Sequence, residues 1–320
     1  MVISDVGLNE PWEENVKQRN DQMLLFIALG DATGVATEYV RKDEFPELIR
    51  NVLLLDGYKQ HPRHHEMQTG YYSDDTQMSI AVAEVLILPH VVTNPRSLLK
   101  LDFAHAFIQA YMRDRRNGYS RSFQTFLDSV RGTDDFLHRI QSKISEKNGA
   151  AMRAVPIGVM RTPGDVLITA SIQASTTHDT RIGRFGSRAV ALMSHFALYE
   201  TAGFDRLYAY LMDYMDMEFR ELCPNLRSRK RGPVLQPATQ TVHAVFDLLT
   251  NQQTLAQVLR GAISMGGDTD TVAAIALGIA SARMRNDIPQ VMFDTLEPHR
   301  NDYGVDFLKT LGRKLMDSYA

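Results

Sequence analysis

The stretch "MGGDTDTVAAIALGIA" (265–280) combines two glycines, alternating aspartates and threonines, and a run with almost no polar atoms. Gly266 and Gly267 permit a tight approach of the backbone. Residues 268–271 then lie where the apolar run predicts the start of a helix, and acidic side chains are favoured at that end. Capping needs one such residue, whereas four are present. The stretch therefore predicts a buried helix whose first turn also carries oxygen ligands.

A second acidic helix start occurs in "YYSDDTQMSIAVAEVLIL" (71–88), where "SDDT" directly precedes another apolar helix. Adjacent aspartates repel each other unless a cation or solvent screens them. Two such helix starts that converge in one core would form a joint site of oxygen ligands. Such ligands, without histidine or cysteine, suit Mg²⁺ or Mn²⁺ rather than zinc, and this many carboxylates can hold two ions roughly 3.5–4 Å apart. The candidate oxygen donors are Ser73, Asp74, Asp75 and Thr76 at the helix start in 71–88, and Asp268, Asp270 and Thr271 at the one in 265–280.

Apolar residues elsewhere recur mostly at helical spacing, in stripes at 23–28, 80–86, 189–198 and 242–249. Alternation typical of a strand is hard to find, and "NVLLLDG" (51–57) is the best candidate. A chain of 320 residues that is 44% hydrophobic can bury a substantial core. We therefore predict one compact all-α domain.

Composition also excludes several classes of function. The net charge of −3 gives no basic field that would favour nucleic acid or an anionic membrane, and the basic run "RSRKR" (227–231) has no interleaved aromatic residues. No apolar run is long enough to span a bilayer. One cysteine in the whole chain fits a reducing compartment. We expect a cytoplasmic protein without a nucleic-acid partner or membrane contact.

Three further segments complete a recognisable set of motifs. "LGDATGVATEY" (29–39) ends the first apolar stripe, "NGAAMRAVPIG" occupies 148–158 and "ASTTHDT" occupies 174–180. Together with "SDDT" and "GGDTDT", in this order and spacing, they resemble the ADP-ribosylglycohydrolase family, whose founding type is the dinitrogenase reductase-activating glycohydrolase. The resemblance runs from about residue 23 to residue 282.

This resemblance implies a single orthogonal helical domain around a dinuclear Mg²⁺ or Mn²⁺ centre. The metal ligands that it implies are Ser73, Asp74, Asp75, Asp268, Asp270 and Thr271. It also implies hydrolysis of the bond that joins ADP-ribose to a modified protein side chain, with arginine as the expected acceptor. Glu38 matches an acidic residue beside the metals that is implicated in catalysis, and either Glu38 or Asp75 could position or deprotonate the attacking water. The residues expected to contact ADP-ribose are Asn148, Gly149, Ala150, Met152, His178 and Gly267. Lys147 departs from the glycine usual at its position and would narrow the pocket or add a phosphate contact.

Two segments leave alternatives open. Residues 1–17 form an N-terminal extension before a domain at 18–320, and Leu8 and Trp12 could anchor it to a partner. Relatives of the family that act as immunity proteins suggest a second function, in which the extension blocks an ADP-ribosyltransferase toxin. The other segment, "HPRHHE" (61–66), could suggest zinc, but three histidines in a polar loop favour a solvated turn near the cleft rim.

Overall fold

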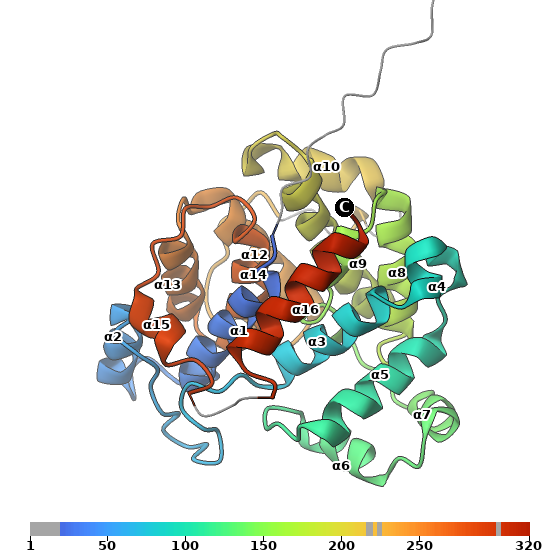
Figure 1. Cartoon of the computed structure of the whole chain (residues 1–320). Coiled ribbons are helices and arrows are strands. Elements are labelled where there is room, and N and C mark those ends of the chain that lie inside the picture. The colour runs from blue at the N-terminus through green and yellow to red at the C-terminus, as the bar shows by residue number, and fades with distance from the viewer. Residues whose placement is uncertain (1–19, 216–219, 223–225, 299–301) are drawn as a thin grey trace, which may run out of the picture.

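The computed structural model describes residues 20–215, 220–222, 226–298 and 302–320, and helices dominate these ranges (Figure 1). Within them, β-pairing is limited to three isolated bridges. The prediction of an all-α fold is confirmed. The α-helices are α1 (Met23–Gly34), α2 (Pro46–Leu54), α3 (Asp74–Leu86), α4 (Pro89–Thr93), α5 (Lys100–Arg113), α6 (Arg121–Ser129), α7 (Thr133–Ile140), α8 (Pro163–Ser175), α9 (Arg181–Tyr199), α10 (Leu207–Tyr214), α12 (Ala238–Asn251), α13 (Leu255–Met265), α14 (Thr269–Ala280), α15 (Gln290–Asp294) and α16 (Val305–Ser318).

The segment at 51–57, our best candidate for a strand, belongs instead to α2 and the turn that ends it. Pro46 occupies the first helical position, where its missing N–H is not needed. Leu55 then adopts a left-handed conformation with φ 58°, and its N–H donates to the Val52 carbonyl. Of this apolar run Val52 and Leu55 are buried, whereas Leu54 is 60% exposed. The run is therefore the end of a partly exposed helix, and periodicity alone does not distinguish so short a run from a strand.

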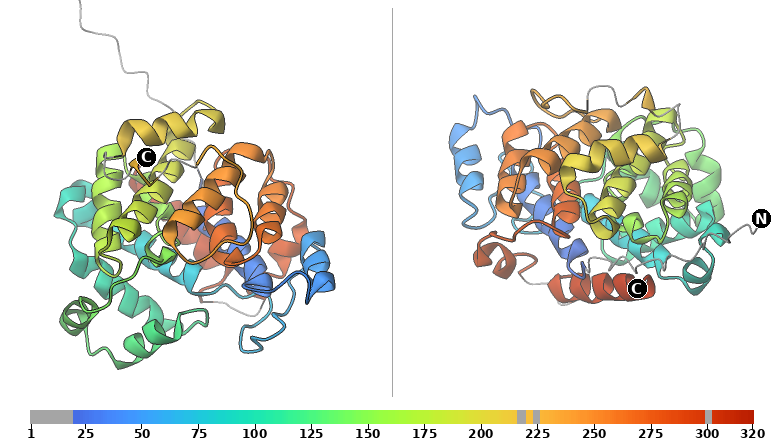
Figure 2. Two further views of the ribbon diagram at one scale, coloured as in Figure 1. Left: turned by 180° about the vertical axis from the view of Figure 1, so that it is seen from behind. Right: turned by 90° about the horizontal axis from the view of Figure 1, so that it is seen from above.

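Helices α1 and α14 form the centre of the molecule, and all twelve residues of each are buried. They pack against each other, and α1 also contacts α3, α13 and α16. The views from behind and from above agree that α1 is enclosed by helices from later parts of the chain (Figure 2). A helix that is apolar on all sides must be surrounded in this way. None of the described helices is long and apolar enough to cross a membrane.

Two glycines of α1 let its backbone touch that of α14. A Cβ added to Gly30 would lie 2.4 Å from the carbonyl oxygen of Ala273. A Cβ on Gly34 would lie 2.3 Å from the Cα of Asp270. Because both obstacles are backbone atoms, neither can move aside without moving a helix. The end of α1 is thereby placed directly against the start of α14.

Asp31, near the end of α1, also holds the start of α3. Its Oδ2 accepts hydrogen bonds from the backbone N–H groups of Ser73 (2.9 Å) and Thr76 (3.0 Å) and from the Thr76 hydroxyl (2.6 Å). One fully buried carboxylate thus satisfies N–H groups that a helix start leaves without partners. The three helices α1, α3 and α14 consequently meet at their polar ends.

The start of α3 is braced from the opposite side by a buried ion pair. Arg116 donates to both carboxylate oxygens of Glu297, at 2.7 and 3.0 Å, and stacks over the Tyr72 ring at 3.7 Å from its centroid. Glu297 in turn accepts from the Tyr72 backbone N–H at 2.9 Å. The residue that precedes Ser73 is therefore fixed by a charge-assisted network.

Replacing Gly30 with alanine should destabilise the protein. Alanine favours a helix over glycine by about 1 kcal/mol, but overpacking costs about 1–3 kcal/mol, and here the obstacle is backbone. We expect a lower free energy of unfolding in urea. The matched control is Gly164→Ala in the first turn of α8, where the added Cβ meets nothing closer than 3.7 Å and stability should hold or rise. A Gly30→Ala protein as stable as the parent would contradict the close packing.

Candidate functional site

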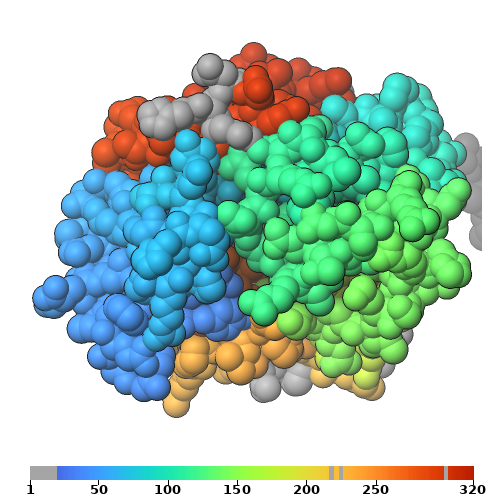
Figure 3. Space-filling model, turned by 90° about the horizontal axis from the view of Figure 1, so that it is seen from below, coloured from blue at the N-terminus to red at the C-terminus, as the bar shows by residue number. Residues whose placement is uncertain are grey.

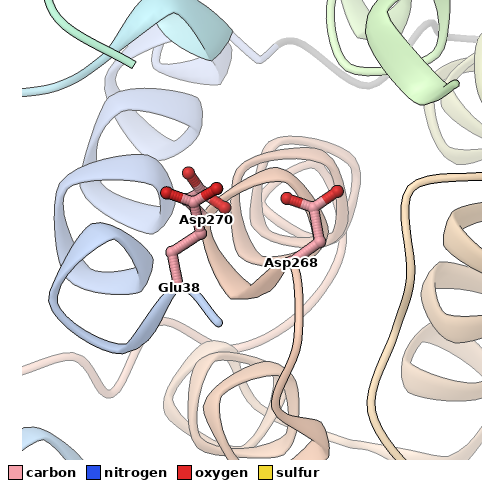
Figure 4. Close-up of side chains that lie close together, drawn as sticks. All are labelled: Glu38, Asp268 and Asp270. Atoms are coloured by element: carbon pink, nitrogen blue, oxygen red, sulfur yellow. The ribbon is translucent and has the colours of Figure 1, made fainter. Parts of the chain in front are cut away.

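Three carboxylates meet where α1 and α14 come together. Glu38 follows the short 3₁₀ helix η1 (Val35–Thr37) that continues α1, while Asp268 and Asp270 lie at the start of α14. One carboxylate oxygen from each lies within 4.8 Å of the others. Figure 4 shows the three side chains pointing to the same side of the α14 terminus. Both aspartates are buried and Glu38 is half-buried.

Helix capping does not account for these acidic residues. Asp268 occupies the N-cap position of α14, yet its side chain makes no capping hydrogen bond. Helix α3 is capped by Ser73, whose hydroxyl accepts from the Asp75 backbone N–H at 3.4 Å. The carboxylates of Asp74 and Asp75 are therefore not needed as caps.

The acidic cluster lies in a cavity of about 460 Å³. Figure 3 shows the hollow between the blue segment around residues 40–70 and the green segment around 110–150. The cavity brings together most of the residues predicted from the sequence, although they come from opposite ends of the chain. The predicted residues that line it are Glu38, Asp74, Asp75, Asn148, Gly149, Met152, His178, Asp268, Asp270 and Thr271.

Three other predicted residues lie behind this lining. Ser73 forms the cap of α3, and Ala150 is fully buried, with its carbonyl accepting from Gln173 at 2.8 Å. Gly267 has φ 83°, and its carbonyl accepts from the Tyr39 N–H at 2.7 Å. The structure places all three as supports for neighbouring site residues rather than as walls of the cavity.

The donor set fits a divalent cation. Asp31 Oδ1, Asp75 Oδ1 and Asp270 Oδ1 are buried and have no hydrogen-bond partner. A buried carboxylate oxygen without a partner is costly. A cation that contacts these three oxygens would offset that cost. Oxygen atoms from carboxylates and hydroxyls are the ligands that Mg²⁺ and Mn²⁺ prefer. The site is thus an acidic group able to bind metal.

The same burial raises the pKa of each carboxyl group. Burial raises the pKa of Glu38 to about 8, and the nearby charges of Asp268 and Asp31 add to the shift. Burial likewise holds the pKa values of Asp74, Asp75 and Asp270 well above the ordinary range, again with contributions from neighbouring acids. Without a cation, burial therefore favours the protonated form of these groups, because several ionised carboxylates repel one another in one buried site.

The model of the ADP-ribosylglycohydrolase family matches residues 13–319 of this chain. The chain belongs to that family. It is 25% identical over 303 residues to human ADP-ribosylhydrolase ARH3, with 79% of this chain and 82% of that protein covered, and 27% identical to the zebrafish (Danio rerio) ARH3, with 78% of each covered. An uncharacterised protein of Archaeoglobus fulgidus is 25% identical, with 92% and 94% covered. A solved structure described as an ADP-ribosylglycohydrolase-related protein complex superposes with a TM-score of 0.68 at 21% identity, covering 96% of this chain and all of that one.

This membership confirms the family and the hydrolase class predicted from the sequence. The proposed immunity role depends on residues 1–17, which lie outside the described residues, so it stays a prediction. So do the partner toxin, the cytoplasmic location and the identity and number of the metal ions.

The motif at 148–158 begins with the short 3₁₀ helix η3 (Asn148–Ala150), which contacts the acidic cluster. The Asn148 side-chain amide donates to Asp268 Oδ2 at 2.5 Å and to Thr241 at 3.0 Å, which joins this loop to the α14 start. Gly149 packs on the His178 ring, since an added Cβ would lie 2.7 Å from its Cε1. Burial lowers the pKa of His178 to about 3, so the ring is neutral. Lys147, the departure from the family pattern, also lines the cavity.

Several site residues escaped the sequence analysis. Asp31 does not line the cavity but anchors α3, and an aspartate inside an otherwise apolar helix was a signal that could have revealed it. Arg153 lines the cavity although its residue is 1% exposed, and it donates to Thr177 at 2.5 Å. Gly118 touches Asp74, and Gln236 closes the cavity near Tyr39. Nothing local in the sequence marks these last two, because long loops bring them in.

The raised pKa values predict how metal and pH act together on stability. The pKa of Glu38 rises from 4.5 in the unfolded chain to about 8 in the folded protein. At pH values between these two, the folded state binds more protons than the unfolded state, so the free energy of unfolding without metal falls as pH rises. A bound cation favours the ionised carboxylates. The increase in melting temperature that Mg²⁺ or Mn²⁺ produces over EDTA should therefore grow across this window.

Glu38→Gln should flatten part of that pH dependence, whereas Asp43→Ala, at an exposed site, should not. A metal-induced shift that is constant across the window would contradict the assignment of buried, proton-retaining carboxyl groups.

Proposed function

We propose that this protein is a metal-dependent hydrolase that removes ADP-ribose from a modified protein side chain. The observation that carries the proposal is the group formed by Glu38, Asp268 and Asp270, which lies in a cavity of about 460 Å³ and includes a buried carboxylate oxygen without a partner. The names of the ARH3 relatives, ADP-ribosylhydrolases, support the same substrate class.

The chemistry of the bond agrees with these residues. Departure of a side chain from the anomeric carbon of ribose builds positive charge on the sugar, and an acidic wall stabilises that charge. When bound, divalent cations supply Lewis-acid polarisation and orient the ribose hydroxyls. The pKa of Glu38, about 8 without metal, lies near neutral pH, as suits a group that exchanges a proton with the attacking water. Asp75 remains the alternative base, since it lines the same cavity.

We further propose arginine as the acceptor. Tyr39 follows Glu38, is 38% exposed, and forms a second hollow with Leu235, Gln236 and Pro237. Gln236 also lines the main cavity, so the two hollows adjoin. A guanidinium group stacks well on an aromatic face and pairs with carboxylates. An aromatic ring beside acidic residues therefore supports arginine over serine.

Free ADP-ribose released from ADP-ribosyl-arginine and ADP-ribosyl-serine proteins, with and without EDTA, tests both proposals. We expect release that EDTA abolishes and that Mg²⁺ or Mn²⁺ restores, with the arginine substrate preferred. Release from serine alone would overturn the acceptor proposal and leave the hydrolase proposal standing. No release from either substrate with either metal would overturn both.

The proposed roles of the carboxylates predict different effects for substitutions at Asp270 and Glu38. Asp270→Ala removes a metal-binding oxygen and should lower turnover by about 10²-fold or more, with little change in metal-free melting temperature because mutual repulsion among the acids is relieved. Glu38→Gln should lower turnover by about 10²–10⁴-fold while keeping the melting-temperature increase produced by Mg²⁺ or Mn²⁺. Asp43→Ala, an exposed carboxylate, serves as the control. Parental turnover in Asp270→Ala would mean that the acidic cluster has no part in catalysis.

The alternative function, inhibition of an ADP-ribosyltransferase toxin, is tested separately. Deleting residues 1–17 should leave hydrolysis intact and abolish binding to the transferase if the extension is inhibitory. Unchanged affinity after the deletion would remove the inhibitory role of this segment.

A further inference from the structure

One histidine of the loop at 61–66 does not behave as a solvated residue. His61 is only 4% exposed, whereas the side chain of His64 is 56% exposed and His65 is exposed. The Nε2 atom of His61 lies 3.0 Å from the backbone carbonyl oxygen of Glu38. The buried ring of His61 therefore contacts the backbone of Glu38, a residue of the acidic cluster.

The hydrogen bonds of His61 fix which nitrogen carries the proton. Its Nδ1 faces the backbone N–H groups of Arg63, at 3.1 Å, and His64, at 2.9 Å. Two donors directed at Nδ1 require it to be the acceptor, so the proton lies on Nε2. His61 therefore donates from Nε2 to the Glu38 carbonyl, while its Nδ1 accepts hydrogen bonds from the backbone of its own loop.

The turn that carries Glu38 is strained and needs such support. Tyr39 has φ 49°, a conformation that non-glycine residues rarely adopt. On the inner side, the Tyr39 N–H donates to the Gly267 carbonyl at 2.7 Å, and the hydroxyls of Thr37 and Thr269 lie 3.0 Å apart. His61 holds the same turn from the outer side. Strained backbone persists only where the surroundings over-determine it.

The loop is itself fastened to the segment that follows the turn. Arg63 pairs with Glu44, and its guanidinium lies over the Phe45 ring at 5.5 Å from the centroid. The loop also contacts the segment next to Gly118, which lines the cavity, since Asn117 donates to the Glu66 carbonyl at 2.8 Å. His61 is therefore attached to a braced support rather than to a freely moving loop.

We propose that His61 is a positioning residue for the hydrolysis, which holds the Glu38 carboxylate at its place beside Asp268 and Asp270 through the hydrogen bond to the Glu38 carbonyl. This proposal rests on the proposed function, in which Glu38 acts on the attacking water. His61 does not line the cavity, so its effect is on the position of Glu38 and not on the binding of ADP-ribose.

Three variants test the proposal. His61→Ala removes the donor, His61→Gln restores an N–H that can reach the same carbonyl, and His65→Ala is the matched control in the same loop. Because a misplacement of about 1 Å can cost 10²-fold, we expect kcat to fall about tenfold to a hundredfold in His61→Ala. KM and the Kd for free ADP-ribose should change little. His61→Gln should recover part of the loss, and His65→Ala should match the parent.

A second measurement does not depend on activity. Amide hydrogen exchange of the peptide around residues 35–40 should be faster in His61→Ala than in the parent or in His65→Ala, while the peptides of α3 and α14 should exchange as before. This outcome would support the positioning role even if the parent proved inactive on every substrate tried, which would overturn only the proposed function.

Any of four results would overturn the inference. The first is parental kcat in His61→Ala, and the second is unchanged exchange at residues 35–40. The third is a loss of ADP-ribose affinity that matches the loss of kcat, since it would show general damage to the site. Failure of His61→Gln to recover any activity, in a protein that exchanges like the parent, would also contradict the role of the hydrogen bond.

Discussion

The structure depends on a backbone contact between two buried helices. Gly30 and Gly34 bring α1 against α14 so closely that no side chain fits between them. This contact puts the end of the first helix beside the start of a helix more than 230 residues later in the chain. Glu38 therefore reaches Asp268 and Asp270 without any long side chain or mobile loop. A looser pair of helices, separated by ordinary side chains at 8–10 Å, would not bring these carboxylates together.

This arrangement has a desolvation cost, because a group of acidic side chains is held away from water. Asp31 offsets part of it, because its Oδ2 replaces water as the acceptor for the N–H groups at the start of α3. The orphaned oxygens of Asp75 and Asp270 have no such compensation. These oxygens must then either receive a proton or contact a cation. The raised pKa values and the suitability of the site for metal therefore have one cause, which is the burial of several carboxylates close together.

The sequence predicted the helical class and the two acidic helix starts, because apolar periodicity and adjacent aspartates are local signals. It left 51–57 undecided, because a short apolar run fits a strand and a helix equally well. It was wrong for His61, because the polar neighbours of this histidine predicted a solvated turn, whereas its ring is buried against Glu38. Positions such as Gly118 and Gln236 could not be predicted, since their place in the cavity depends on how long loops return to it.

The site combines two kinds of support for its carboxylates, and the difference supports the roles that we propose for them. Asp75 and Asp270 stand on the first turns of helices, whose backbone cannot shift without disturbing the core. Carboxylates on such rigid backbone suit the role of metal ligands, because metal ligands must keep a fixed geometry although they repel one another. Glu38 stands instead on a turn whose next residue has a positive φ, tied to the core by Gly267 and to the surface loop by His61. Hydrogen bonds from two sides hold this turn and so keep the Glu38 carboxylate where it can exchange a proton with the attacking water. The turn thus suits proton transfer, while the helix starts suit the binding of charge.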